Sequence, residues 1–234
     1  MKSDFIQQIS HEIRTPLNIL SGFTQVLTMP DMEYDEETLE DFKRQITENT
    51  DRITGLVNKM LELSEAKNNT VIERSDNVSP VQIAVEAVNS SNIANASHLT
   101  FDMQVSPEAE QTTIQTNLSA AVRALSQLLD NARKFTAPAE GHQHDTSTDR
   151  QQKVVLRITV SSGRLFFSVE DTGIGVPYKE AERIFEEFVQ LDEYYDGTGI
   201  GLTVARSLVR RIGGNIMVDT AYIGGSRFVM TVPC

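Results

Sequence analysis

The stretch FIQQISHEIRTPLNIL, residues 5–20, has the pattern of an amphipathic helix, although it contains a histidine and a proline. At about 100° per residue on a helical wheel, the apolar side chains of this region fall on a single narrow stripe. The stripe comprises Ile6, Ile9, Ile13, Leu17, Leu20 and Leu27. We therefore expect a helix that packs through one face.

A second and more regular series, with steps of three and four residues, occupies the next part of the chain. It comprises Leu39, Phe42, Ile46, Asn49, Ile53, Leu56, Met60 and Leu63. A period of about 3.5 residues is typical of left-handed packing of helix on helix. Between the two series, PDMEYDEE (residues 30–37) supplies a proline and acidic residues for a turn and a helix cap. Residues 1–70 are therefore expected to form a helical hairpin.

Two helices alone cannot surround a core. The hairpin is therefore expected to pair with a second copy of itself, as a homodimer that contains a four-helix bundle. Asn49 is the one polar member of the second series. It either sets the register between helices or occupies a position that reaches water.

Residues 66–79 lose the periodicity and gain polar residues, which indicates a linker ahead of a second domain over residues 76–234. In that domain we expect helices over residues 81–94, 118–135 and 200–212, and strands in LTFDMQV (99–105), TTIQT (112–116), KVVLRITVSS (153–162), RLFFSVED (164–171), NIMVDT (215–220) and SRFVMTV (226–232). Helices mixed with mostly antiparallel strands predict the α+β class, as a sandwich. Residues 137–152 form a polar insertion, in which His142 and His144 lack the supporting ligands of a metal site.

The composition excludes several classes of function. A net charge of −12 argues against broad binding of nucleic acid or of anionic membranes. The single cysteine, Cys234, forms no intrachain disulfide, which favours a reducing compartment such as the cytoplasm. No apolar run approaches the roughly 20 residues of a membrane span, so this segment is expected to make no membrane contact. A membrane anchor or sensor of the natural protein would lie outside it.

The opening stretch carries a candidate reactive side chain. His11 lies almost opposite the apolar stripe, with Thr15 one turn later beside it, so both are expected to face solvent. A mostly neutral imidazole offers a nitrogen lone pair, and Glu12 could orient the ring or take its proton. Pro16 has no N–H for the carbonyl of Glu12, which predicts a weakened and kinked helix at this turn. An incidental surface histidine is the alternative.

Three further stretches suggest a nucleotide. In VEDTGIGVP (169–177), Asp171 ends a strand and could accept a hydrogen bond from an exocyclic amine such as that of adenine, while glycines let a flat ligand approach the backbone. In DGTGIGLTVARSLV (196–209), glycines lead into a helix whose first N–H groups suit phosphate. In LLDNARKFT (128–136), Asn131 and Lys134 share a helix face and suit Mg²⁺ and phosphate. Taken singly, each stretch also fits an ordinary turn, a loop end or a solvated helix face.

Together, in this order and spacing, the stretches resemble the catalytic core of a sensor histidine kinase. SHEIRTPL (10–17) is similar to the family's H box, LLDNARKFT to its N box, DTGIGVP (171–177) to its G1 box, IFEEF (184–188) to its F box and GTGIGL (197–202) to its G2 box. The resemblance covers nearly the whole chain. It implies a dimerisation and histidine-phosphotransfer hairpin followed by a Bergerat-type ATP-binding sandwich.

The resemblance also implies a reaction. His11 would attack the γ-phosphorus of ATP bound with Mg²⁺, with Glu12 as the base, and the phosphoryl group would pass to an aspartate of a response-regulator receiver domain. Thr15 would position water for dephosphorylation of the regulator. The implied nucleotide-binding set is Asn131, Lys134, Asp171, Gly173, Gly175, Gly197, Thr198, Gly199, Gly201 and Leu202, with Asn131 and Gln127 toward the metal.

Two departures from the family pattern bear on this set. Gln127 stands where the family often has an asparagine, and the segment VQLDEYYDG (189–197) is short and acidic, without the Lys or Arg of many relatives. We therefore expect weak, magnesium-dependent ATP binding. The rival functions are a catalytically silent dimeric scaffold and a hydrolase like the related gyrase or heat-shock ATPases.

Overall fold

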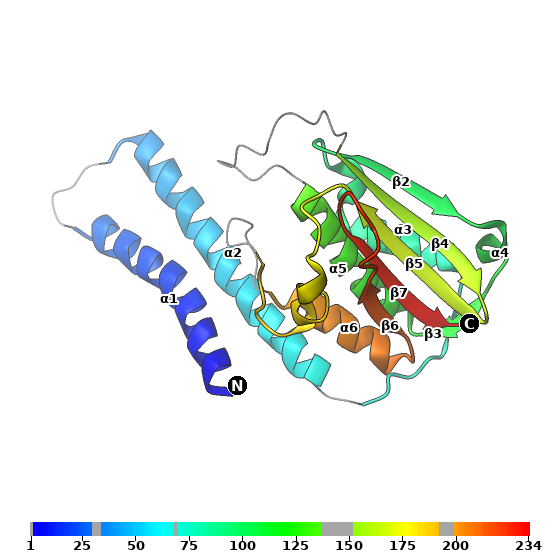
Figure 1. The fold of residues 1–234 in the computed structure, drawn as a ribbon. Coiled ribbons are helices and arrows are strands. Elements are labelled where there is room, and N and C mark those ends of the chain that lie inside the picture. Colours follow the sequence, from blue (N-terminus) through cyan, green and yellow to red (C-terminus); the bar gives the residue numbers. More distant parts are fainter. Residues whose placement is uncertain (1, 30–33, 68–69, 137–151, 192–198) are drawn as a thin grey trace. The chain divides into compact units, whose positions relative to one another are not determined.

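The computed structural model describes residues 2–29, 34–67, 70–136, 152–191 and 199–234 (Figure 1). The chain divides into two compact units, Met1–Glu65 and Ala66–Cys234. The functional boundaries expected from the sequence, 1–70 and 76–234, stay a prediction. Residues 137–151 of the polar insertion, with His142 and His144, lie outside the described residues.

The first unit is a helical hairpin, as expected, of α1 (Lys2–Leu27) and α2 (Glu36–Lys67). Asp35 caps α2, because its Oδ1 accepts a hydrogen bond from the Thr38 N–H at 2.8 Å. Hydrogen bonds from the hydroxyl and the N–H of Thr38 hold the pKa of Asp35 below its usual value. The α1 helix continues on both sides of Pro16, so the proline does not end it. Among the described helices, none is long and apolar enough to cross a membrane.

The expected packing stripes are partly buried in the hairpin. Leu56 is 7% exposed and Asn49 8% exposed. The Asn49 amide donates to the carbonyl of Gln45 at 2.7 Å, within its own helix. Leu17 and Leu27, in contrast, are 50% and 40% exposed. The hairpin therefore leaves part of its apolar stripe uncovered.

The second unit is the expected α+β sandwich. Its five-stranded sheet has the order β2-β4-β5-β7-β6, with only β2 and β4 parallel. Three helices, α3, α5 and α6, cover one face of this sheet (Figure 1). The strands are β2 (Thr100–Val105), β4 (Lys153–Ser161), β5 (Arg164–Asp171), β6 (Asn215–Val218) and β7 (Arg227–Pro233); the helices are α3 (Pro80–Ser91), α5 (Leu118–Thr136) and α6 (Gly201–Arg211).

Alternation along β5 separates the two faces of the sheet. Leu165, Phe167 and Val169 are fully buried beneath the helices. The residues between them point to the opposite face, which ends with Glu170. Asp171, the last residue of β5, returns to the helix-covered side. The strand therefore delivers one carboxylate to each face at the same end of the sheet.

The structure differs from the expected linker in one region. Asp76–Val78 form β1, which pairs with β3 (Ile114–Thr116) in a separate two-stranded sheet. The Asp76 carboxylate also accepts from the Leu118 N–H at 2.9 Å, at the start of α5. Polar residues that suggested a linker therefore act partly as a helix cap. Four short elements were not expected: α4 (Pro107–Glu110), η1 (Ile93–Asn95), η2 (Tyr178–Glu180) and η3 (Arg183–Phe185).

Candidate functional site

Asp171 is a buried carboxylate at the end of β5, with 2% of its surface exposed. Its Oδ1 accepts hydrogen bonds from the N–H groups of Gly173 at 2.9 Å and Ser226 at 3.1 Å. The Ser226 hydroxyl also forms a hydrogen bond with the Asp171 carboxylate. Burial raises the pKa of Asp171, and the hydrogen bonds from Gly173 and Ser226 oppose that rise.

Gly173 joins this carboxylate to the end of α5. A Cβ atom at Gly173 would lie 2.2 Å from the carbonyl oxygen of Phe135. The next residue, Ile174, donates its N–H to the same oxygen at 3.4 Å. Any side chain at position 173 would therefore prevent the contact between its backbone and that of Phe135. The expectation that Gly173 also makes room for a flat ligand stays a prediction.

Gly225 lies on the other side of Asp171. Its φ is +156°, and a Cβ atom there would lie 1.8 Å from the carbonyl oxygen of Asp171. Gly175, at φ +77°, is close to Gly225, since its Cβ atom would lie 3.2 Å from the Gly225 carbonyl oxygen. Residues 173–177 and 222–225 line a pocket of about 440 Å³, and Gly173 in this lining donates its N–H to the Asp171 carboxylate.

Replacing Gly225 with Ala should destabilise the second unit by about 2–4 kcal/mol, because the added methyl group collides with the Asp171 backbone. Chemical denaturation measures this loss. Gly224→Ala is the matched control, since Gly224 also has a positive φ, +106°, but has nothing within 4 Å of its Cβ position. Equal losses in the two variants would show that the collision is relieved without cost.

The glycines before α6 bring two more segments together. Gly199 has φ +65°, and a Cβ atom there would lie 2.6 Å from the backbone of Phe188. Gly201 begins α6, and its Cβ atom would lie 2.6 Å from Oε1 of Gln127 on α5. The predicted phosphate and metal residues are thus neighbours at this point. Gly197, Thr198 and most of the acidic segment lie outside the described residues.

Asn131 and Lys134 lie half-buried in the second half of α5. The Lys134 ammonium is 4.7 Å from the centre of the Phe135 ring. Within the part of the chain that the structure describes, the Asn131 amide makes no hydrogen bond. The same part contains no group of three His, Cys, Asp or Glu residues that could hold a metal. Leu202 is half-buried in the first turn of α6.

Residues 184–188 pack against α6. Ile184 and Phe185 are buried, and the Thr203 hydroxyl on α6 donates to the Phe185 carbonyl at 2.9 Å. The Arg206 guanidinium lies 4.1 Å from the centre of the Phe185 ring and pairs with Glu182 at 2.8 Å. The apolar residues of this stretch therefore fix the helix that starts at Gly201.

The candidate reactive turn of α1 lies in the other unit. The side chain of His11 is outside the described residues. Glu12 is half-buried, and its Oε2 lies 3.5 Å from Nη2 of Arg52 on α2. Thr15 is exposed, as expected, whereas Pro16 is buried.

Family models match both units. Residues 116–234 match "Histidine kinase-, DNA gyrase B-, and HSP90-like ATPase", and residues 1–69 match "His Kinase A (phospho-acceptor) domain". The chain is a sensor histidine kinase catalytic core. The first match covers half of the chain, and the two together place the phospho-acceptor model ahead of the ATPase model, in the order that the motifs predicted.

Individual histidine kinases resemble this core over its whole length. The sensory/regulatory protein RpfC of Xanthomonas campestris is 33% identical over 99% of this chain and 31% of RpfC. The chain spans about a third of the length of the curated relatives that it matches. Full-length ShkA, solved with AMPPNP, is 27% identical with a TM-score of 0.66 over 98% of this chain and 45% of ShkA. ThkA, solved with the response regulator TrrA, has the same fold, with a TM-score of 0.71 at 19% identity over 98% of this chain and 61% of ThkA.

Several contributors to the histidine kinase site were not predicted from the sequence. Ser226 bonds Asp171 through its N–H and its hydroxyl, the carbonyl of Phe135 contacts the backbone at Gly173, and Arg52 reaches Glu12 from another helix. The only local signal for Ser226 is its place after Gly224 and Gly225, directly before an alternating strand.

Proposed function

We propose that this core transfers the γ-phosphoryl group of ATP to His11 and then to an aspartate of a response-regulator receiver domain. In the first step an imidazole nitrogen attacks the γ-phosphorus, the bond to the β–γ bridging oxygen breaks, ADP leaves and the ring proton passes to Glu12. The observation that carries the proposal is the buried Asp171 carboxylate, held by two backbone N–H groups beside a pocket. A carboxylate so placed recognises the amino group of adenine.

The residues around Asp171 suit the rest of the nucleotide. Asn131 and Gln127 offer amide oxygens, which Mg²⁺ accepts alongside phosphate oxygens and water. Bound Mg²⁺ would neutralise charge on the phosphates. The first N–H groups of α6, near Gly199 and Gly201, and the Lys134 ammonium would bind phosphate oxygens. Gly175, Gly197, Thr198 and Leu202 complete the proposed set.

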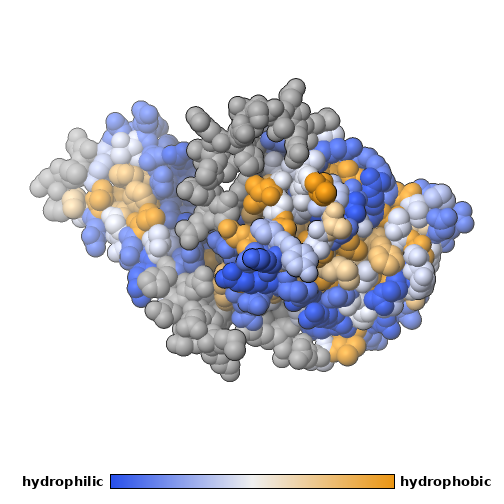
Figure 2. Space-filling model, in the orientation of Figure 1, coloured by the Kyte–Doolittle hydropathy of each residue, from blue (hydrophilic) through white to orange (hydrophobic). Residues whose placement is uncertain are grey.

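The hairpin is proposed to act as a homodimer. Figure 2 shows an apolar patch on the hairpin that is flanked by hydrophilic residues. Leu17, Leu27 and Leu39 are each more than a third exposed, so a second hairpin would bury apolar surface that one hairpin leaves open. ATP and response regulators are available in the cytoplasm, where we place this core, alone or as part of a membrane-anchored sensor. Nucleic acid is not among the proposed partners.

ATP affinity should be weak and should fall at least about tenfold when EDTA removes magnesium, since few protein cations replace the metal's charge. Isothermal titration in Mg²⁺ and in EDTA measures both affinities. Asn131→Ala should lose most of the magnesium dependence, whereas Asn89→Ala, at an exposed position on α3, should keep it. Tight ATP binding in EDTA would contradict the metal's proposed place.

Pro16→Ala should change the ratio of kinase to phosphatase activity by about threefold or more, because the substitution restores the N–H that bonds the Glu12 carbonyl, across the helix turn that contains Thr15. Thr15 is proposed to position water for dephosphorylation of the regulator. Both rates are measured on the same preparation, with γ-labelled ATP and with a phosphorylated receiver domain. Unchanged rates would remove the proline from the mechanism.

The fate of γ-labelled ATP tests the proposed function as a whole. Acid-labile label on the protein supports the kinase. Free phosphate without labelled protein would instead favour a hydrolase of the same ATP-binding fold. A dimeric chain that gives neither product would be a scaffold.

A further inference from the structure

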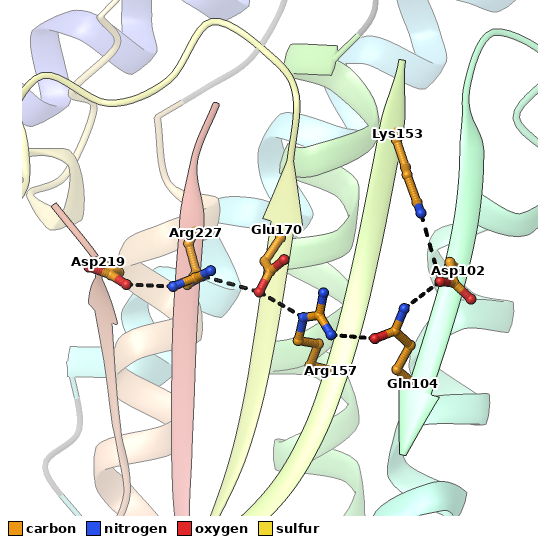
Figure 3. Close-up of polar contacts among 7 residues, drawn as sticks. All are labelled: Asp102, Gln104, Lys153, Arg157, Glu170, Asp219 and Arg227. Atoms are coloured by element: carbon orange, nitrogen blue, oxygen red, sulfur yellow. Dashed lines mark hydrogen bonds and ion pairs between the residues drawn. The ribbon is translucent and has the colours of Figure 1, made fainter. Parts of the chain in front are cut away.

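A chain of polar side chains crosses the sheet on the face away from the helices (Figure 3). Its members belong to every strand of the five-stranded sheet except β6, and the last member, Asp219, directly follows β6. In spatial order its members are Lys153, Asp102, Gln104, Arg157, Glu170, Arg227 and Asp219. We call this set the polar ladder.

The strand register places these side chains within reach of one another. Gln104 is directly opposite Arg157, and Glu170 is directly opposite Arg227. Arg157 lies diagonally from Glu170, because Arg157 pairs with Ser168. Direct and diagonal neighbours on one sheet face are the pairs that interact.

Glu170 is the buried member of the polar ladder, with a side chain that is only 9% exposed. Its Oε1 lies 3.0 Å from Nε of Arg157 and 3.1 Å from Nε of Arg227. A buried carboxylate requires such partners, since removing one leaves charge without compensation. Two guanidinium groups therefore converge on one oxygen at the end of β5.

The position of this oxygen relates the polar ladder to the nucleotide site. Glu170 directly precedes Asp171, and Arg227 directly follows Ser226. Asp171 and Ser226 are themselves joined twice, through the Asp171 N–H to the Ser226 carbonyl at 2.9 Å and the Ser226 N–H to Oδ1 at 3.1 Å. The ion pair on one face of the sheet thus holds the same two strands as the carboxylate contact on the other.

Arg227 has two further contacts, both with the loop that leads to Ser226. Its Nη1 lies 2.9 Å from Oδ2 of Asp219, and its guanidinium lies 4.4 Å from the centre of the Tyr222 ring. Tyr222 to Gly225 form one wall of the pocket beside Asp171. Arg227 therefore connects Glu170, the pocket wall and Ser226, whereas Arg157 has no such connection to the loop among its described contacts.

We propose that Arg227 and Glu170 are positioning residues for nucleotide binding. They keep Ser226 and the 219–225 loop against Asp171, so that the carboxylate presents one fixed acceptor geometry to the base. This inference rests on the proposed role of Asp171 in binding adenine. It assigns this role to Arg227 and not to Arg157, although both guanidinium groups form ion pairs with the same oxygen of Glu170.

Arg227→Gln and Arg157→Gln test the inference as a matched pair. Each removes one cation from Glu170, so both should lower the stability measured by denaturation. Only Arg227→Gln should weaken ATP binding, by about tenfold, because only it releases the loop and Ser226. Arg227→Lys keeps a cation beside Glu170 and should bind ATP with intermediate affinity. Equal loss of ATP affinity in the two Gln variants, or no loss in Arg227→Gln, would overturn the inference.

Asp171→Asn, titrated beside them, distinguishes two kinds of failure. If Asp171→Asn loses ATP affinity and Arg227→Gln does not, the positioning role is wrong and the nucleotide site stands. If Asp171→Asn binds ATP as the unchanged chain does, the adenine assignment is wrong and the inference falls with it.

Discussion

Replacing Asp171 with Asn is expected to weaken ATP binding by at least about 100-fold. The Asn oxygen can still accept from Gly173 and Ser226, as Oδ1 of Asp171 does. Its NH₂ group would then face the amino group of adenine, donor against donor, in a buried site. Isothermal titration with ATP and Mg²⁺ measures the loss. An affinity within about threefold of the unchanged chain would contradict adenine recognition by this carboxylate.

The same substitution should leave the fold at least as stable at neutral pH. Burial raises the pKa of Asp171 above its ordinary 3.8, so ionisation costs stability once the pH exceeds the unfolded value. The stability advantage of Asp171→Asn should therefore grow as the pH rises from below 3.8 through the raised folded pKa, and then stay constant. Urea unfolding at a series of pH values measures this.

The pKa of Asp219 is shifted in the opposite direction to that of Asp171, so its effect on stability should have the opposite pH dependence. The N–H of Ala221 and the guanidinium of Arg227 hold the pKa of Asp219 below its ordinary value. Its contribution to stability is therefore present above the unfolded pKa and is lost as the pH falls through the lowered folded pKa. Asp219→Asn should be less stable than the unchanged chain at neutral pH, and the gap should close in acid. The same pH trend in both variants would contradict the assigned directions.

Replacing His11 with Gln should abolish labelling of the protein by γ-labelled ATP, a loss of at least about 1000-fold. An amide nitrogen has no lone pair available for attack on phosphorus. ATP affinity should be unchanged, since the nucleotide is proposed to bind in the other unit.

His98→Gln is the matched control for this variant. His98 lies in the ATP-binding unit, where its Nε2 is 3.1 Å from the carbonyl oxygen of Arg133. This variant should be labelled like the unchanged chain. Label retained in His11→Gln would place the phosphoryl acceptor elsewhere.

Local patterns predicted most of the fold. The stripe around Ile13 predicted α1, and alternation through Phe167 predicted β5, because one-sided burial imposes a period on a helix or a strand. The parallel pairing of β2 with β4 and the pairing of β1 with β3 were not predicted. Strand partners far apart in the chain leave no periodic mark on either segment.

Site residues were predictable only where the local sequence around them is distinctive. Asp171 stands out because a carboxylate ends an apolar strand. Ser226 does not, because its N–H and hydroxyl groups meet Asp171 from 55 residues away in the sequence. Gly173 was selected for the approach of a ligand, whereas its contact with Phe135 depends on how α5 lies against β5, which the sequence does not display. Arg227 resembled any charged residue on the open face of a strand.

Phosphorus NMR of the intact protein after incubation with ATP and Mg²⁺, compared with His11→Gln, tests whether a histidine nitrogen carries the phosphoryl group. We expect one new resonance of a phosphorus–nitrogen bond that disappears in acid and is absent from the variant. A phosphate ester that survives acid, or the same acid-labile resonance in the variant, would contradict it.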